Sequence, residues 1–176
     1  TSFAQQCMME KGLKIFGEEG KKATLKELGQ LLDRTCFVPV KVSEMSNRER
    51  KKAMRALMCL CQKRDGKIKG RMVYNGRPAR EWLGKEESAS PAAALESLFL
   101  TTLVDACERR DMMTCDIPNA FTQAFIPDYD NTQKEQIHMK MAGVLVDVLI
   151  KLNPTMHKDF VVHENGTKVV CVKVIK

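Results

Sequence analysis

Two alternating runs of residues, joined by a short turn, limit what this chain can fold into more than any other feature. From about residue 55 to residue 62, side chains alternate with the two-residue period of a β-strand, and residues 68–74 return as a second strand. Asp65 and Gly66 lie between the runs and suit the positive dihedral angles of a tight turn. The sequence therefore predicts a β-hairpin, closed by a further turn at Asn75 and Gly76.

The predicted hairpin lies in a strongly basic stretch. The chain has 29 Lys and Arg against 22 Asp and Glu, a formal net charge of +7. Clustered cations are the footprint expected for contacts with phosphates, whereas a solvated charged surface is the plain alternative. The clustering favours a nucleic-acid partner. The cations within residues 51–80 are Lys51, Lys52, Arg55, Lys63, Arg64, Lys67, Lys69, Arg71, Arg77 and Arg80.

Helical patterns occur on both sides of the hairpin. Residues 1–16 are expected to be helical but poorly capped, and residues 17–20 to separate them from a better amphipathic helix over 21–34. Ser46 and Glu49 have the spacing of a capping box, which predicts the start of a basic helix. The clearest helix begins at Ser90-Pro91, and its apolar stripe predicts burial in the core. The stripe comprises Leu95, Leu98, Phe99, Thr102, Leu103 and Ala106.

Other segments predict strands and a C-terminal hairpin. Residues 36–40 are extended, with Pro39 disfavouring a central strand. Residues 136–141 alternate as a strand that includes His138, residues 144–152 form a short helix, and Asn165-Gly166 marks a hairpin across 160–172. These elements predict an α+β fold of antiparallel strands with packed helices.

Residues 112–124 combine an apolar run, an acid and a Pro. The run over 112–115 predicts a strand that ends at Asp116, and Pro118 predicts a short helix with Ile117 at its cap. Asp116 then lies outside the cap, where it has no evident structural role. A turn or surface position is the alternative for an isolated aspartate of this kind.

The cysteines and the hydropathy of the sequence indicate which cellular compartment the protein occupies. Seven scattered cysteines, an odd number, predict reduced and mostly buried thiols in an intracellular protein. The chain lacks the Cys and His spacing of a structural zinc site, the pattern of a secretory leader and the ~18 apolar residues of a membrane span. Because the sequence begins at Thr1, we expect it to be a piece of a longer protein.

Three elements of the sequence, taken in order, resemble the reverse transcriptase of copia-type (Pseudoviridae) retrotransposons: the basic hairpin ending in residues 69–73, the following helix and the segment 115–121. The residues that show this resemblance are Lys69-Gly70-Arg71-Met72-Val73 and Cys115-Asp116-Ile117-Pro118-Asn119-Ala120-Phe121, followed by the strand Ile137-His138-Met139-Lys140. The likeness covers nearly the whole chain. It implies the fingers and first part of the palm of a right-hand polymerase, over residues 36–176, preceded by a helical segment over 1–35.

The resemblance also implies roles for individual residues. Asp116 would be the first catalytic carboxylate and, with the backbone carbonyl of Ile117, would hold Mg²⁺, which prefers hard oxygen ligands. Lys69 and Arg71 would contact the triphosphate, and Phe121 would lie under the sugar and exclude a 2′-hydroxyl. The cations implied in nucleic-acid binding are Lys63, Arg64, Lys67 and Arg77.

One family feature is missing from the sequence. Family members use two Mg²⁺ ions held partly by an Asp-Asp pair, and this sequence contains no such pair. We therefore expect an N-terminal fragment that is inactive alone and truncated before that motif. The implied partners are an RNA or DNA primer-template, deoxynucleoside triphosphates and the rest of a polyprotein, including the rest of the palm, integrase and RNase H. The implied locations are a cytoplasmic virus-like particle and the nucleus, with no membrane association.

Two other classes of function compete with this interpretation. A non-catalytic, basic nucleic-acid-binding α+β module, including a degenerate element remnant, would use the hairpin and leave Asp116 inert. A thiol-based redox protein is disfavoured because no cysteine begins a helix in a Cys-x-x-Cys arrangement.

Overall fold

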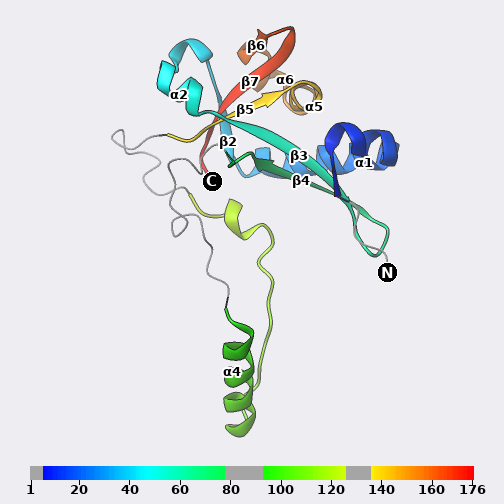
Figure 1. Ribbon diagram of the computed structural model, residues 1–176, viewed down its shortest axis with the longest axis vertical. Helices are drawn as coiled ribbons and strands as arrows, with labels where there is room; N and C mark the ends of the chain where they lie inside the picture. The colour runs from blue at the N-terminus through cyan, green and yellow to red at the C-terminus, as the bar shows by residue number, and fades with distance from the viewer. Residues whose placement is uncertain (1–5, 78–92, 126–135) are drawn as a thin grey trace. The chain divides into compact units, whose positions relative to one another are not determined.

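The computed structural model describes residues 6–77, 93–125 and 136–176, which contain five α-helices and a seven-stranded mixed sheet (Figure 1). This is a mixed α and β fold, as predicted. Contacts within the chain define two compact units. The first unit comprises residues 1–78 and 121–176 and holds the sheet, and the second comprises residues 79–120.

The first unit contains all seven strands. They are β1 (Gln6–Met8), β2 (Phe37–Val40), β3 (Met54–Gln62), β4 (Ile68–Tyr74), β5 (His138–Ala142), β6 (Val161–Glu164) and β7 (Thr167–Val174). Its helices are α1 (Met9–Asp33), α2 (Asn47–Lys52), α5 (Val144–Leu152) and α6 (Pro154–His157), with short 3₁₀ turns η1 (Val42–Glu44) and η4 (Lys158–Phe160). A third 3₁₀ turn, η3 (Ala120–Thr122), spans the boundary between the two units. The second unit contains α4 (Leu95–Cys107).

Strand β3 pairs with β4 along most of its length, with β1 over three residues and with β5 at its first two residues, so it links the hairpin to the rest of the sheet. The strand order is β1-β3-β5-β7-β2, with β4 also paired to β3 and β6 to β7. Strands β3 and β5 are parallel through Met54 and Arg55, which corrects the prediction of an antiparallel sheet. A parallel pair needs a long connection, and the residues between β3 and β5 provide one. Pro39 lies in β2, which ends this order, so the predicted avoidance of a central strand is confirmed.

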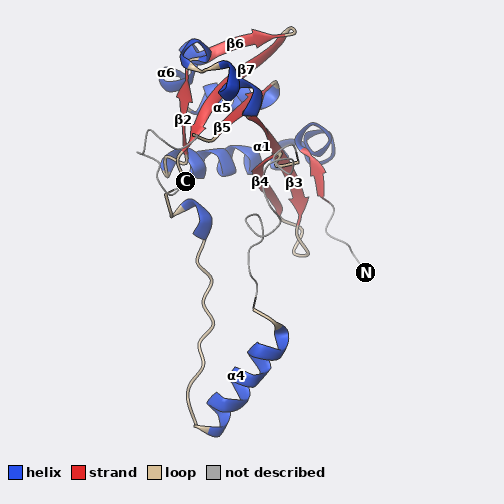
Figure 2. Ribbon diagram, turned by 60° about the vertical axis from the view of Figure 1, so that its left-hand side comes forward, coloured by secondary structure: helices blue, strands red, loops and turns tan. Residues whose placement is uncertain are grey.

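The core lies between the sheet and helices α1 and α5. Leu28 of α1, Met58 of β3 and Met141 of β5 belong to one buried cluster, together with Val146 and Leu149 of α5. Figure 2 shows α1 beside β3 and β4, and the three elements are in contact. Helix α1 therefore supports the hairpin from one side.

Local turn and cap signals gave correct predictions. Ser46 caps α2 through a complete capping box, with the Glu49 N–H donating to Ser46 Oγ at 3.2 Å and the Ser46 N–H donating to Glu49 Oε2 at 2.7 Å. Asn165 and Gly166 both have positive φ between β6 and β7. At the β3–β4 turn only Gly66 does, with φ 82°, so this turn is a three-residue type rather than the two-residue type.

Predictions near the N-terminus were right in part. Residues 6–8 form β1 and not a helix, because they pair with Cys59–Cys61 of β3. The break predicted at residues 17–20 is a kink at Gly17 within α1, with φ 51° and ψ −125°.

The second unit differs most from expectation. Residues 112–115 are irregular and not a strand, and Pro118 opens a turn before η3 instead of a helix. Helix α4 forms over the predicted stripe but begins at Leu95, and the predicted start at Ser90-Pro91 lies outside the described residues. None of its residues is buried, and Phe99 and Leu103 are 64% and 61% exposed. The prediction of a core helix was therefore wrong in this structure, because within this unit α4 has no other described helix or strand to pack against.

Candidate nucleic-acid interface

The alternation of β4 places Lys69 and Arg71 on the same face of the hairpin. Both side chains are exposed, whereas Gly70 between them is buried and Met72 is half-buried on the side of α1. The Met72 N–H donates to Glu27 Oε1 of α1 at 3.2 Å, which fixes this edge of β4 to the helix. The two cations thus project from the face opposite α1.

Apolar side chains surround these two cations. In the hairpin register Arg71 is opposite Cys59 and Lys69 is opposite Cys61, so the two half-buried thiols share the cationic face. Met8 of β1 lies there too, with its Sδ 3.9 Å from Cys59 Sγ. A face that combines cations with apolar side chains can contact both the phosphates and the sugars or bases of a polynucleotide.

The predicted cations at the tip are also exposed. Lys63, Arg64 and Lys67 surround Asp65, whose Oδ1 accepts the Lys67 N–H at 3.1 Å. This backbone hydrogen bond, more than the Lys67 ammonium at 3.5 Å, lowers the pKa of the Asp65 carboxyl. The carboxylate offsets part of the charge of Lys67 and, more weakly, of Lys63, so the tip keeps a net positive charge.

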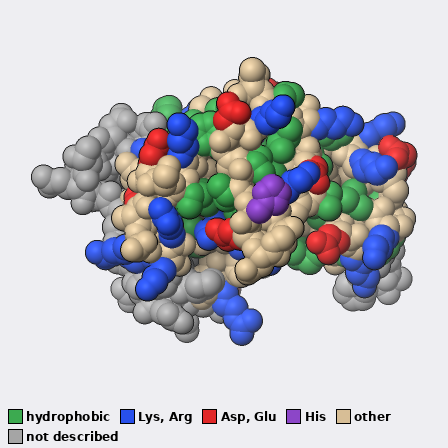
Figure 3. Space-filling view, turned by 90° about the horizontal axis from the view of Figure 1, so that it is seen from above, with side chains coloured by type: hydrophobic (Ala, Val, Ile, Leu, Met, Phe, Trp, Pro, Cys, Tyr) green, Lys and Arg blue, Asp and Glu red, His purple; other side chains and the backbone are tan. Residues whose placement is uncertain are grey.

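Some cations of the first unit are paired with a carboxylate in the described structure, and others are not. Lys140 pairs with Glu164 at 3.1 Å and Lys168 with Asp147 at 2.6 Å, and basic and acidic side chains are interspersed over the face in Figure 3. Lys69 and Arg71 have no ion-pair partner among the residues that the structure describes. Their charge is therefore available to an external anion.

The remaining predicted site residues are Arg77, Phe121, Asp116 and Ile117. Arg77 is exposed, three residues beyond β4, and its N–H donates to Asn75 Oδ1 at 3.2 Å. Phe121 lies in η3, and its side chain is outside the described structure. Asp116 and Ile117 belong to the second unit, in an irregular segment where both are exposed. The structure therefore groups the cations of the hairpin in the first unit, and Asp116 belongs to the second unit.

Asp116 and Ile117 offer oxygen ligands of the type that Mg²⁺ binds, but too few of them for a complete site. A carboxylate and a free backbone carbonyl are hard oxygen ligands of the type Mg²⁺ takes. Within residues 6–77, 93–125 and 136–176, however, no group of three or more His, Cys, Asp or Glu is arranged to hold a metal ion. Asp116 and Ile117 would thus form part of a metal site and need further acids to complete it.

Two of the cysteines behave as structural residues. All seven are free, and burial raises the pKa of the Cys36 and Cys171 thiols. A raised pKa lowers the fraction of reactive thiolate, which opposes nucleophilic or redox chemistry at these two positions. The prediction of mostly buried thiols was wrong, since Cys7, Cys59 and Cys61 are half-buried and Cys107 and Cys115 are exposed.

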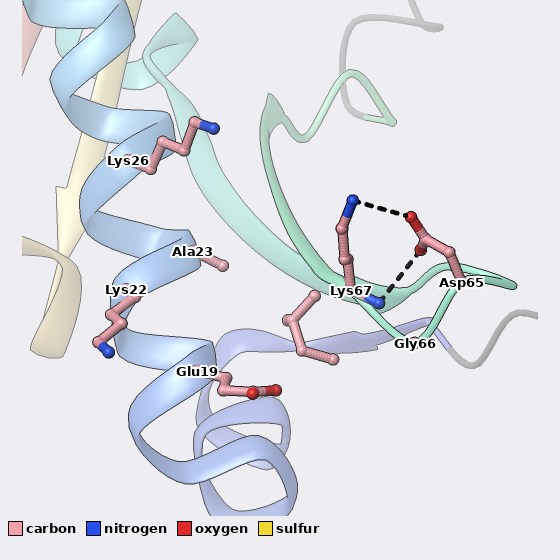
Figure 4. Close-up of a pocket in the computed structure, with 8 residues that line it drawn as sticks. Glu19, Lys22, Ala23, Lys26, Asp65, Gly66 and Lys67 are labelled. Atoms are coloured by element: carbon pink, nitrogen blue, oxygen red, sulfur yellow. Dashed lines mark hydrogen bonds and ion pairs between the residues drawn. The ribbon is translucent and has the colours of Figure 1, made fainter.

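The sequence analysis did not identify a second group of cations near the hairpin. Lys22 and Lys26 of α1 line a hollow of about 590 Å³ next to the hairpin tip (Figure 4). The lysines are four residues apart on the polar side of a predicted helix, which places them together on its surface. The sequence contains that signal, but not the closeness of α1 to the hairpin.

Comparisons of the chain with protein-family models, curated proteins and solved structures gave no match. Among the residues described, no helix has the length and apolar character needed to cross a membrane.

Proposed function

We propose that this chain is the fingers and first part of the palm of an RNA-directed DNA polymerase from a copia-type retrotransposon. Alone, it binds primer-template but does not add nucleotides. The observation that best supports the proposal is the pair Lys69 and Arg71, exposed side by side on a hairpin face with no carboxylate partner in the described structure. Two exposed cations on one face can contact the phosphates of a triphosphate or of a nucleic-acid backbone.

The proposed reaction is phosphoryl transfer to a primer 3′-hydroxyl. It depends on positioning and on neutralising the charge that develops on the transferred group. Lys69 and Arg71 would supply positive charge, and Asp116 with the Ile117 carbonyl would hold Mg²⁺ with acids from outside this chain. Bound Mg²⁺ would act as a Lewis acid and orient the phosphates.

A non-catalytic nucleic-acid-binding module is the second candidate. It is favoured by one observation, the irregular and exposed segment that holds Asp116, where the polymerase interpretation predicts a strand. Both candidates use the hairpin cations, but only the polymerase needs Asp116. A substitution at Asp116 therefore separates them.

We expect the chain to bind primer-template with strong salt dependence, which fluorescence anisotropy across a salt series measures. Released counterions make the logarithm of affinity fall linearly with the logarithm of salt concentration. The double substitution Lys69→Gln and Arg71→Gln removes two phosphate contacts, so the slope should fall by about 2. Affinity for different sequences should fall alike, because phosphate contacts carry no base information.

The matched control is Lys11→Gln with Lys14→Gln. Both lysines are exposed on α1, and the change in net charge is the same. An equal loss of slope in this control would show that only net charge matters. A wild-type affinity that does not respond to salt would refute phosphate binding.

Phe121→Val in the full-length polymerase is expected to raise ribonucleotide incorporation far more than it lowers deoxyribonucleotide incorporation. In the proposed pocket the ring excludes a 2′-hydroxyl by a steric clash, and a smaller side chain relieves it. Single-nucleotide addition with each substrate measures both rates. Equal losses for the two substrates would place Phe121 outside the nucleotide pocket.

A further inference from the structure

Three side chains that contain sulfur lie together on the hairpin face that carries Lys69 and Arg71. Cys59 and Cys61 alternate with the fully buried Leu60, which faces α1, so both thiols are on the other side of β3 and are half-buried there. The register of β1 places Met8 directly opposite Cys59, with the Met8 Sδ 3.9 Å from Cys59 Sγ. We call Met8, Cys59 and Cys61 the sulfur cluster.

The two thiols of the sulfur cluster are better placed for a metal ion than for a disulfide. Their Cα atoms, two residues apart on one strand, are separated by about 6.6 Å, at the upper end of the range for disulfides. A metal ion with bonds to sulfur of roughly 2.3 Å bridges sulfurs that are about 4.6 Å apart, so the side chains approach each other less. Cys61 Sγ makes only a weak contact, 3.6 Å from the Gln62 carbonyl oxygen, and can turn towards Cys59 at little cost.

The softness and the number of the ligands select the metal. Thiolate and thioether sulfur are soft ligands that suit Cu(I), whereas Mg²⁺ and Ca²⁺ take oxygen. A structural Zn²⁺ site uses four Cys, His or carboxylate ligands, and the sulfur cluster has only two of these. The ranges that the structure describes contain no group of three His, Cys, Asp or Glu that could hold a metal ion. Two thiolates and one thioether match a three-coordinate Cu(I) ion instead.

The neighbouring cations offset the charge of such a complex. Cu(I) bound by two thiolates has a single net negative charge, because binding releases a proton from each thiol. Arg71 is opposite Cys59 and Lys69 is opposite Cys61, on the strand that pairs with the other edge of β3 from β1. Neither cation has an ion-pair partner among the described residues. The two cysteines therefore lie between a third sulfur ligand on β1 and two cations on β4.

We propose that the sulfur cluster binds one Cu(I) ion through the thiolates of Cys59 and Cys61 and the thioether of Met8. This site does not depend on the proposed function. Because Met8 is on β1 and the cysteines are on β3, the bound ion would also fix β1, a strand of 3 residues, to the hairpin. Cu(I) should therefore raise the midpoint of thermal unfolding of the reduced chain.

The test titrates the reduced 176-residue chain with Cu(I) without oxygen, in competition with a chromophoric Cu(I) chelator. We expect one ion to bind, and X-ray absorption to show three sulfur neighbours around it. Cys59→Ser with Cys61→Ser removes both thiolates, so the affinity should fall by more than the ~100-fold that loss of an outer-shell partner can cost. Excess Zn²⁺ should not displace Cu(I), because the cluster offers Zn²⁺ too few ligands.

Cys107→Ser with Cys115→Ser is the matched control, because it removes two exposed thiols that belong to the second unit. This variant should keep the wild-type affinity for Cu(I). Equal losses in the two double variants, or wild-type affinity in Cys59→Ser with Cys61→Ser, would overturn the inference. Displacement of Cu(I) by Zn²⁺ would show that the metal is wrongly assigned.

Met8→Leu tests the site without removing a half-buried thiol. It keeps the approximate size of an exposed side chain and removes only the sulfur, so the metal-free chain should unfold at the wild-type temperature. The number of sulfur neighbours around Cu(I) should fall from three to two, with a smaller loss of affinity than in the cysteine variant. Three sulfur neighbours in Met8→Leu would refute the proposed site, even if Cys59→Ser with Cys61→Ser did not fold.

Discussion

Under the proposed function, replacing Asp116 with Asn in the full-length protein is expected to abolish nucleotide addition while primer-template affinity stays nearly the same. Asn keeps the shape of Asp but removes the negative charge and replaces one carboxylate oxygen with an NH₂ group, which cannot bind Mg²⁺. The charge on the transferred phosphoryl group would then be poorly compensated, at a cost of several kcal/mol, or on the order of a thousandfold in rate. Single-turnover addition separates this step from binding.

Asp111→Asn is the matched control for this prediction. Asp111 is an exposed acid in the same irregular segment, five residues before Asp116. Its substitution by Asn therefore removes the same negative charge at a nearby position. Its rate should remain close to that of the wild type. Near-normal turnover in Asp116→Asn, or equal losses in both variants, would show that Asp116 is not a catalytic carboxylate.

Features set by a few neighbouring residues were predictable from the sequence. The Ser46 capping box, the turn at Asn165-Gly166 and the β3–β4 hairpin each depend on local hydrogen bonds and dihedral angles. The shared face of Lys69 and Arg71 follows from the same local rule, since side chains in a strand alternate. The central part of the candidate interface can therefore be predicted from the sequence alone.

Features that depend on distant partners were not predictable. An apolar run such as 112–115 becomes a strand only if another strand pairs with it, and no strand is described in the second unit. The stripe of α4 predicts an apolar face but not the surface that covers it, and Leu98 remains 53% exposed. The parallel pairing of β3 with β5 and the hollow at Lys22 likewise arise from tertiary contacts.

Gly70→Ala is expected to destabilise the first unit by about 1–3 kcal/mol, a cost typical of overpacking. A Cβ on residue 70 would lie 2.8 Å from the Ala23 carbonyl oxygen and 3.2 Å from Glu27 Cβ. The nearer atom is helix backbone, which cannot rotate away as a side chain can. Helix α1 would have to move off β4, which would also weaken the hydrogen bond from the Met72 N–H to Glu27.

Gly29→Ala provides the matched control for Gly70→Ala. Gly29 lies in α1, and a Cβ there would meet no heavy atom within 4 Å. Since Ala favours a helix over Gly, this variant should gain about 0.5–1 kcal/mol. Urea unfolding of the two variants should therefore shift the midpoint in opposite directions. An unchanged midpoint in Gly70→Ala would mean that α1 and β4 are not as close as the structure places them, and the hollow between α1 and the hairpin would lose its support with that contact.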